Sequence, residues 1–144
     1  MTSNRSIWIS RLLIAAVTFF NLQAAFLFLA APARFTAGFE LSGAVGDAMV
    51  RGMGLLFLMW NIPYLFALFD PFRHRVSLIE ALIMQFIGVT GETLLLILLP
   101  GDHPVIGQTV LRFIYFDGTG FLALLAAFII TLAARRLTVA NPQV

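Results

Sequence analysis

Residues 76–99 read VSLIEALIMQFIGVTGETLLLILL, an apolar run interrupted by only two carboxylates, Glu80 and Glu92. Three further apolar runs cover about residues 12–31, 47–69 and 109–134. Each run has about 20 residues or more, the length that an α-helix needs to cross roughly 30 Å of hydrocarbon. The sequence therefore predicts an all-α fold: a single integral membrane domain in which four transmembrane helices, including one at about 76–99, form a bundle.

The composition points to the same class of protein. Hydrophobic residues make up 60% of the 144 residues and charged residues only 11%, whereas a soluble domain carries roughly a quarter. The net charge of +2 and the scattered arginines argue against nucleic acid as a partner and leave the lipid bilayer as the expected surroundings. The absence of cysteine excludes disulfides and thiolate-bound metals. No catalytic, cofactor or metal motif is present, so we expect a protein that binds no cofactor and no metal, and the sequence favours a non-enzyme over an enzyme.

The arginines predict an orientation. Six of the nine lie before the first run, between the second and third runs, or after the fourth, whereas only Arg34 lies outside the runs on the other side. The positive-inside rule then places both termini in the cytoplasm. A cleaved signal peptide is the alternative interpretation of the first run, because Arg5 and Arg11 precede it and residues 30–33 loosely resemble a cleavage site.

Polar and charged side chains lie inside the runs, at similar predicted depths. At heptad spacing, each helix has one face that combines polar or small residues with apolar ones, as buried faces of membrane bundles do. Glu92 and Asp117 fall on these faces, roughly 10–12 Å from the helix ends, so we expect them to line one site. The candidates for ligand binding or ion pairing are Asn21, Gln23, Arg51, Glu92, Arg112 and Asp117.

Two arginines are the expected partners of the two acids. An unpaired charge within the membrane costs about 2.5–3.5 kcal/mol on insertion scales, so pairing of Arg51 or Arg112 with the acids is favoured, above all an Arg51–Glu92 pair. Such a cluster is either a polar chamber for a small ligand or protons, or an ion-pair network that only fixes the packing. Asn61 and Pro63 predict a kink in the second helix, with Asn61 bonded to a neighbouring helix.

The layout of the motifs resembles a known family. The first helix ends in Ala31-Pro32-Ala33-Arg34-Phe35, and the second begins with Arg51-Gly52-Met53-Gly54 and closes with Asp70-Pro71-Phe72-Arg73. Arg112 and Asp117-Gly118 follow on the fourth. This pattern is similar to the DoxX-like group of small four-helix bacterial membrane proteins. The resemblance implies the fold, a bacterial inner membrane, and a subunit role like that of members that belong to membrane oxidoreductases. It transfers no catalytic residue.

Three functions remain open from the sequence. The first is an accessory subunit of a larger membrane complex, or a homo-oligomer, without chemistry of its own. The second is a transporter or binding protein for a small lipophilic or protonatable ligand, which would use the Glu/Asp/Arg cluster. The third is a membrane-embedded isomerase in which Glu92 and Asp117 move protons as an acid–base pair.

Overall fold

The computed structural model describes the backbone of residues 2–140 and the side chains of residues 5–136. Within this part the chain is helical and contains no strand. In chain order the elements are α1 (Thr2–Ala30), the 3₁₀ turns η1 (Pro32–Arg34) and η2 (Thr36–Phe39), α2 (Gly43–Trp60), α3 (Ile62–Phe69), α4 (Arg75–Leu98) and α5 (Pro104–Ala140).

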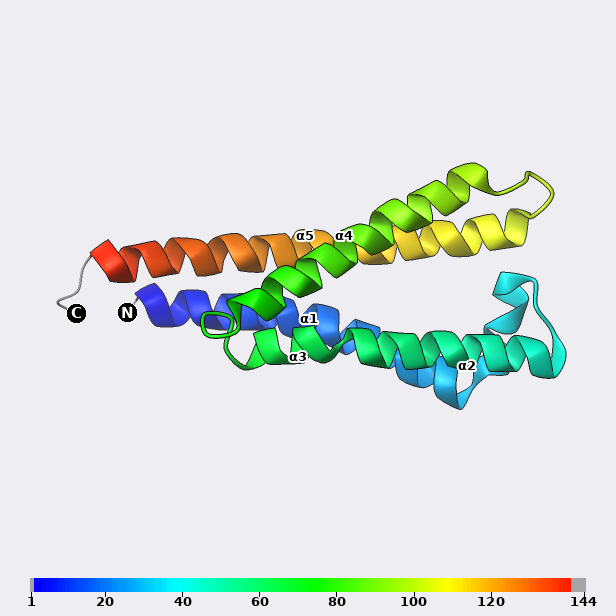
Figure 1. Ribbon diagram of the computed structural model, residues 1–144, viewed down its shortest axis with the longest axis horizontal. Coiled ribbons are helices and arrows are strands. Elements are labelled where there is room, and N and C mark those ends of the chain that lie inside the picture. The colour runs from blue at the N-terminus through cyan, green and yellow to red at the C-terminus, as the bar shows by residue number, and fades with distance from the viewer. Residues whose placement is uncertain (1, 141–144) are drawn as a thin grey trace.

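Four helical stretches are long and apolar enough to cross a membrane, which confirms the predicted fold class. They are Arg5–Ala30, Gly43–Phe69, Arg75–Leu98 and Pro104–Arg136. The helices extend beyond the predicted bounds of the first, second and fourth runs, because a helix continues into polar sequence that the apolar pattern does not cover. Figure 1 shows the N- and C-termini at the same end of the bundle. We call this the terminal end, and the end with η1, η2 and the α4–α5 connection the far end.

The second membrane-crossing stretch consists of two helices, α2 and α3, which meet at Asn61. Pro63 lacks a backbone N–H and its ring crowds the preceding turn, so the helix breaks just before it. The Asn61 side-chain amide donates to the Phe57 carbonyl oxygen of its own helix at 2.7 Å. The predicted kink is therefore present, but the prediction that Asn61 bonds a neighbouring helix is wrong. Its side-chain oxygen is buried without a hydrogen-bond partner.

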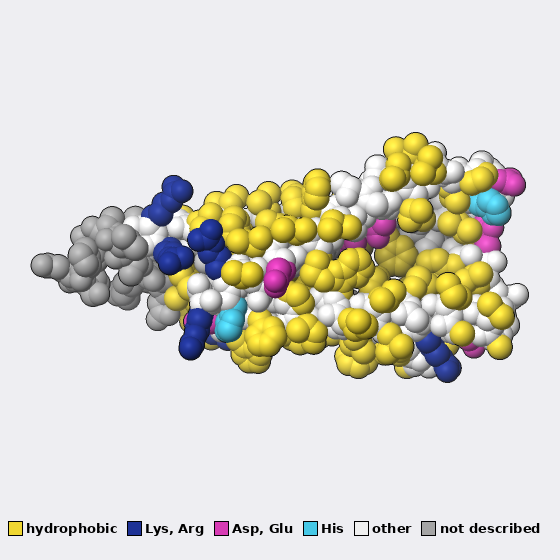
Figure 2. Space-filling model, in the orientation of Figure 1, with side chains coloured by type: hydrophobic (Ala, Val, Ile, Leu, Met, Phe, Trp, Pro, Cys, Tyr) yellow, Lys and Arg dark blue, Asp and Glu magenta, His cyan; other side chains and the backbone are white. Residues whose placement is uncertain are grey.

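The half of the bundle toward the terminal end holds the packed core. Ser10 on α1 donates to the Ala127 carbonyl oxygen on α5 at 3.1 Å, and Thr131 donates to the same oxygen at 2.7 Å. Small residues allow these helix backbones to approach closely. Hydrophobic side chains cover much of the exterior, as expected for a surface that faces lipid (Figure 2). Arginines gather near the terminal end, where the membrane-crossing helices begin and end (Figure 2). The buried hydrophobic cluster consists of Ile14, Val17, Tyr64, Ala67, Leu78, Ala81, Leu124 and Ala127.

At the far end, polar contacts join the α1–α2 connection to the start of α5. Glu40, which has a left-handed backbone with φ of 53°, lies 2.6 Å from His103 Nδ1 through its carboxylate and accepts from the Ile106 backbone N–H at 3.4 Å. Thr109 donates to the Gly38 carbonyl oxygen at 2.7 Å. The hydrogen bond with His103 lowers the pKa of Glu40, and the same bond raises the pKa of His103. We call the Glu40–His103–Ile106 contact the far-end clasp.

Candidate functional site

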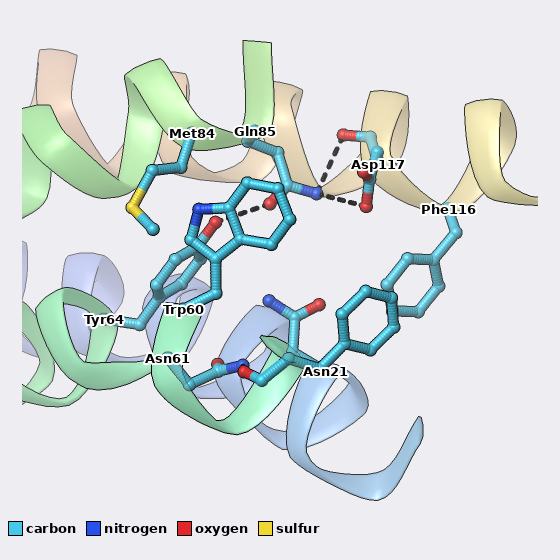
Figure 3. A pocket seen from close by; sticks show the side chains of 9 residues that line it. Asn21, Trp60, Asn61, Tyr64, Met84, Gln85, Phe116 and Asp117 are labelled. Atoms are coloured by element: carbon cyan, nitrogen blue, oxygen red, sulfur yellow. Dashed lines mark hydrogen bonds between the residues drawn. The ribbon is translucent and has the colours of Figure 1, made fainter. Parts of the chain in front are cut away.

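Three helices contribute a row of hydrogen-bonded side chains at mid-depth in the bundle (Figure 3). Tyr64 on α3 donates to Gln85 Oε1 on α4 at 2.6 Å, and to the Ala81 carbonyl oxygen at 3.2 Å. The Gln85 amide donates to Asp117 on α5, to Oδ1 at 2.9 Å and to the backbone oxygen at 3.1 Å. Asp117 lies thirteen residues into α5, roughly 20 Å along a helix that rises about 1.5 Å per residue. The row is therefore deep in the membrane-crossing part of the fold.

Two glycines create the space that this row occupies. A Cβ atom at Gly88 would collide with the Asp117 carboxylate. A Cβ atom at Gly120 would lie 2.6 Å from the Gln85 amide nitrogen. Gly91 and Gly118, their neighbours in the sequence, face open space. Gly88 and Gly120 thus allow polar side chains to lie between the α4 and α5 backbones.

The structure brings the carboxyl groups of Glu92 and Asp117 into hydrogen-bonding contact. Glu92 reaches Asp117 from α4, two turns beyond Gln85 on the same helix face. One Glu92 oxygen, Oε2, is buried and has no hydrogen-bond partner. A hydrogen bond between two carboxyl groups requires a proton on one of them, since an ionised carboxylate only accepts. Two carboxyl groups in this arrangement can share a proton.

The arginines do not join this acid pair. Arg51 and Arg112 are both exposed, and within the described residues neither forms an ion pair with a carboxylate. The expected Arg51–Glu92 pair is therefore wrong. The reason lies in the order of the helices: α2 packs against α1, whereas α4 packs against α5 and α3. Helical periodicity placed Arg51 and Glu92 on similar faces but could not reveal that their helices are apart.

The two amide candidates on α1 are separated by the structure. Asn21 is half-buried and lines a small polar cavity beside Gln85 and Asp117. Gln23 is exposed, because two residues along a helix turn the side chain by about 200°. Gln23 is therefore not part of the site. Tyr64 was missed by the sequence analysis, although it lies one turn after Asn61 on the face that carries that polar residue.

Two cavities meet beside the row of polar side chains. The smaller has a volume of about 30 Å³ and is lined by Asn21, Asn61, Gln85 and Asp117 among others, which is enough for one or two water molecules. The larger, about 430 Å³, lies between α1 and α5. Asn21, Gln85 and Phe116 line both cavities, so the two adjoin at these side chains. The larger cavity is otherwise mainly apolar.

These features define the class of the protein. It is a multi-pass membrane protein, folded as a four-helix bundle, that contains two half-buried carboxyl groups in contact and two adjoining cavities. Within the described residues no group of three His, Cys, Asp or Glu side chains could hold a metal ion. Comparisons with family models, with curated proteins and with solved structures found no match to this chain.

Proposed function

We propose that this chain is a membrane-embedded carrier or binding protein that takes up a small lipophilic ligand together with a proton. The Glu92–Asp117 acid pair holds the proton. The apolar body of the ligand occupies the cavity between α1 and α5, and its polar group faces Asn21 and Gln85. Gln85 connects the ligand to Asp117 through the hydrogen bonds of the polar row.

The observation that carries this proposal is the contact between two half-buried carboxyl groups that, within the described residues, form no ion pair with an arginine. If each acid were paired with an arginine, the pair could have a purely structural role, because the two opposite charges would stabilise each other. Two acids in contact do not attract each other once both are ionised, and each is costly in hydrocarbon. Ionisable groups that face a bundle interior in this way are typical of proton and substrate pathways.

The cavity supports the nature of the ligand. Its volume of about 430 Å³ lies within the range of about 300–1,000 Å³ found for small-molecule sites. The lining is mainly apolar, with Asn21, Gln85 and Thr119 as the polar groups that could orient a ligand. A mostly apolar pocket with few polar groups is typical of a site for a lipophilic molecule with one polar end.

The other two functions have less support. An accessory subunit needs no acid pair within the membrane, so the Glu92–Asp117 contact favours a binding function over that role. A proton-shuttling isomerase would need a substrate carbon next to Asp117. The space beside that side chain has a volume of only about 30 Å³, which suits water better than a substrate.

Infrared titration of the protein in lipid tests the proposal. We expect a protonated-carboxyl band between about pH 5 and pH 8, the range in which proton exchange is useful, and we expect Asp117→Asn or Glu92→Gln to remove it. Glu80→Gln is the matched control, because Glu80 is an exposed carboxylate on the same helix. If the wild-type protein has no such band, or if the band survives both site variants, the acid pair does not hold a proton and the proposed function is wrong.

We infer the orientation and the family from the sequence. Both termini in the cytoplasm, an inner-membrane location and membership of the DoxX-like group are supported by the arginine distribution and the loop motifs. Cysteines introduced at Ser77 and Asp102 lie at opposite ends of the bundle, so only the cysteine at residue 102 should react with an impermeant reagent added outside sealed cells. Reaction of both from outside would contradict this topology.

A further inference from the structure

A third cavity, of about 320 Å³, lies at the far end of the bundle and is separate from the acid pair. It opens to the surface and is lined by residues of α1, both 3₁₀ turns, α2 and α5. Figure 2 shows the far half of the molecule hollowed, with hydrophobic side chains on the floor of the hollow. Six phenylalanines contribute most of the lining: Phe28, Phe35, Phe39, Phe57, Phe113 and Phe116.

The phenylalanine rings form a connected aromatic wall around this cavity. Phe28 stacks on Phe57 with ring centroids 5.8 Å apart, and Phe39 stacks on Phe113 at 6.1 Å. Phe28 also meets Phe35 edge to face at 4.7 Å. Such a wall offers both ring faces and ring edges, which are the two surfaces that a flat aromatic guest contacts. An engineered cavity of about 150 Å³ holds benzene, so this one has room for a body of one or two rings.

Two arginines line the same cavity and give it a charge. Arg34 follows the end of α1 and Arg112 lies on α5, and both are exposed. Within the described residues neither forms an ion pair, and no Asp or Glu lines the cavity. A guanidinium group is a planar fork of donors that matches a carboxylate, which it can bind through two parallel hydrogen bonds. The cavity therefore combines an aromatic interior with a positive, hydrogen-bond-donating rim.

We propose that this cavity is a binding site for a small aromatic carboxylate that arrives from the far side of the membrane. The ring system lies against the phenylalanine wall, and the carboxylate accepts hydrogen bonds from Arg34 and Arg112. This site uses neither residue of the acid pair, so an experiment that refutes one of the two proposals does not refute the other. Phe57 and Phe116 line both this cavity and the small cavity beside the polar row, so these two rings lie between the two regions.

Binding of 2-naphthoate tests the proposal, with the neutral 2-naphthalenemethanol as the matched probe. Equilibrium dialysis would use the full chain in phosphatidylcholine nanodiscs, with empty nanodiscs to correct for partitioning into lipid. We expect 2-naphthoate to bind at least about tenfold more tightly than the neutral probe, since hydrogen bonds to charged groups are the stronger kind. We expect Arg34→Gln and Arg112→Gln each to weaken 2-naphthoate binding by about tenfold or more.

Two further variants separate the effects of charge, shape and folding. Arg51→Gln removes an exposed arginine that does not line the cavity and should leave binding unchanged. Ala24→Leu adds bulk to the cavity wall and should weaken binding of both probes while the protein keeps its helix content and elution volume. Equal binding of the two probes, equal losses in Arg51→Gln and Arg112→Gln, or unchanged binding in Ala24→Leu would each overturn the proposal.

Competition identifies the source of the anion. Inorganic phosphate at the same concentration should displace little 2-naphthoate, because it has no ring to occupy the aromatic wall. Nanodiscs that contain phosphatidylglycerol should leave most of the binding in place. Full displacement by phosphate would indicate a site for any small anion, and full loss in phosphatidylglycerol would indicate a lipid-headgroup site. Either result would overturn the assignment to a soluble aromatic carboxylate.

Discussion

Replacing Gln85 with methionine tests the hydrogen-bonded row most directly. Methionine nearly preserves the side-chain volume but removes three hydrogen bonds, one from Tyr64 at 2.6 Å and two to Asp117 at 2.9 and 3.1 Å. Hydrogen bonds between membrane helices contribute about 0.6 kcal/mol each on average, and at most about 1.7 kcal/mol. Tyr64 keeps its bond to the Ala81 carbonyl oxygen, so its hydroxyl is not left unpartnered. We therefore expect Gln85→Met to lower the free energy of unfolding by about 2 kcal/mol.

The matched control is the same substitution at Gln23, which is exposed on α1. Exposed substitutions usually change stability by no more than about 0.5 kcal/mol, so Gln23→Met should be nearly neutral. Both free energies can be measured by titrating the protein in lipid–detergent micelles with sodium dodecyl sulfate and following helix content by circular dichroism. If the two variants lose the same stability, or if Gln23→Met loses more, the assignment of Gln85 to a buried row is refuted.

Two other predictions follow from the glycines and from the far-end clasp. Gly88→Ala places a Cβ atom against the Asp117 carboxylate and should destabilise the bundle by about 1–3 kcal/mol in the same titration. Gly91→Ala is the control and should not destabilise it, because the space beside Gly91 is open. Equal losses of stability in the two variants would contradict this prediction. The clasp is complete above the ordinary pKa of Glu40, 4.5, and below that of His103, 6.5, because the contact lowers the first pKa and raises the second. The difference in melting temperature between wild type and Glu40→Gln should therefore be largest between these two pH values. It should shrink as the pH falls through the folded-state pKa of Glu40, and also as the pH rises through the folded-state pKa of His103. A difference that does not depend on pH would exclude the clasp.

The sequence by itself determined the class of fold. In a bilayer no water satisfies the backbone, so a span must be a helix that bonds internally, and four apolar runs of sufficient length predict four such helices. The break between α2 and α3 was equally local, because Pro63 removes a donor and crowds the preceding turn. These features depend only on neighbouring residues in the chain, which is why the pattern was enough.

Only the tertiary structure decided which polar side chains meet. Periodicity placed Glu92, Asp117 and Arg51 on comparable faces, yet only the two acids are in contact. The choice depends on which helices are neighbours, since α4 packs against α5 whereas α2 packs against α1. The far-end cavity was also not predicted from the sequence, because its aromatic wall is assembled from phenylalanines of α1, the α1–α2 connection, α2 and α5. Helix order and rotation arise from packing between distant segments, so residues on separate helices become one site only when the bundle forms.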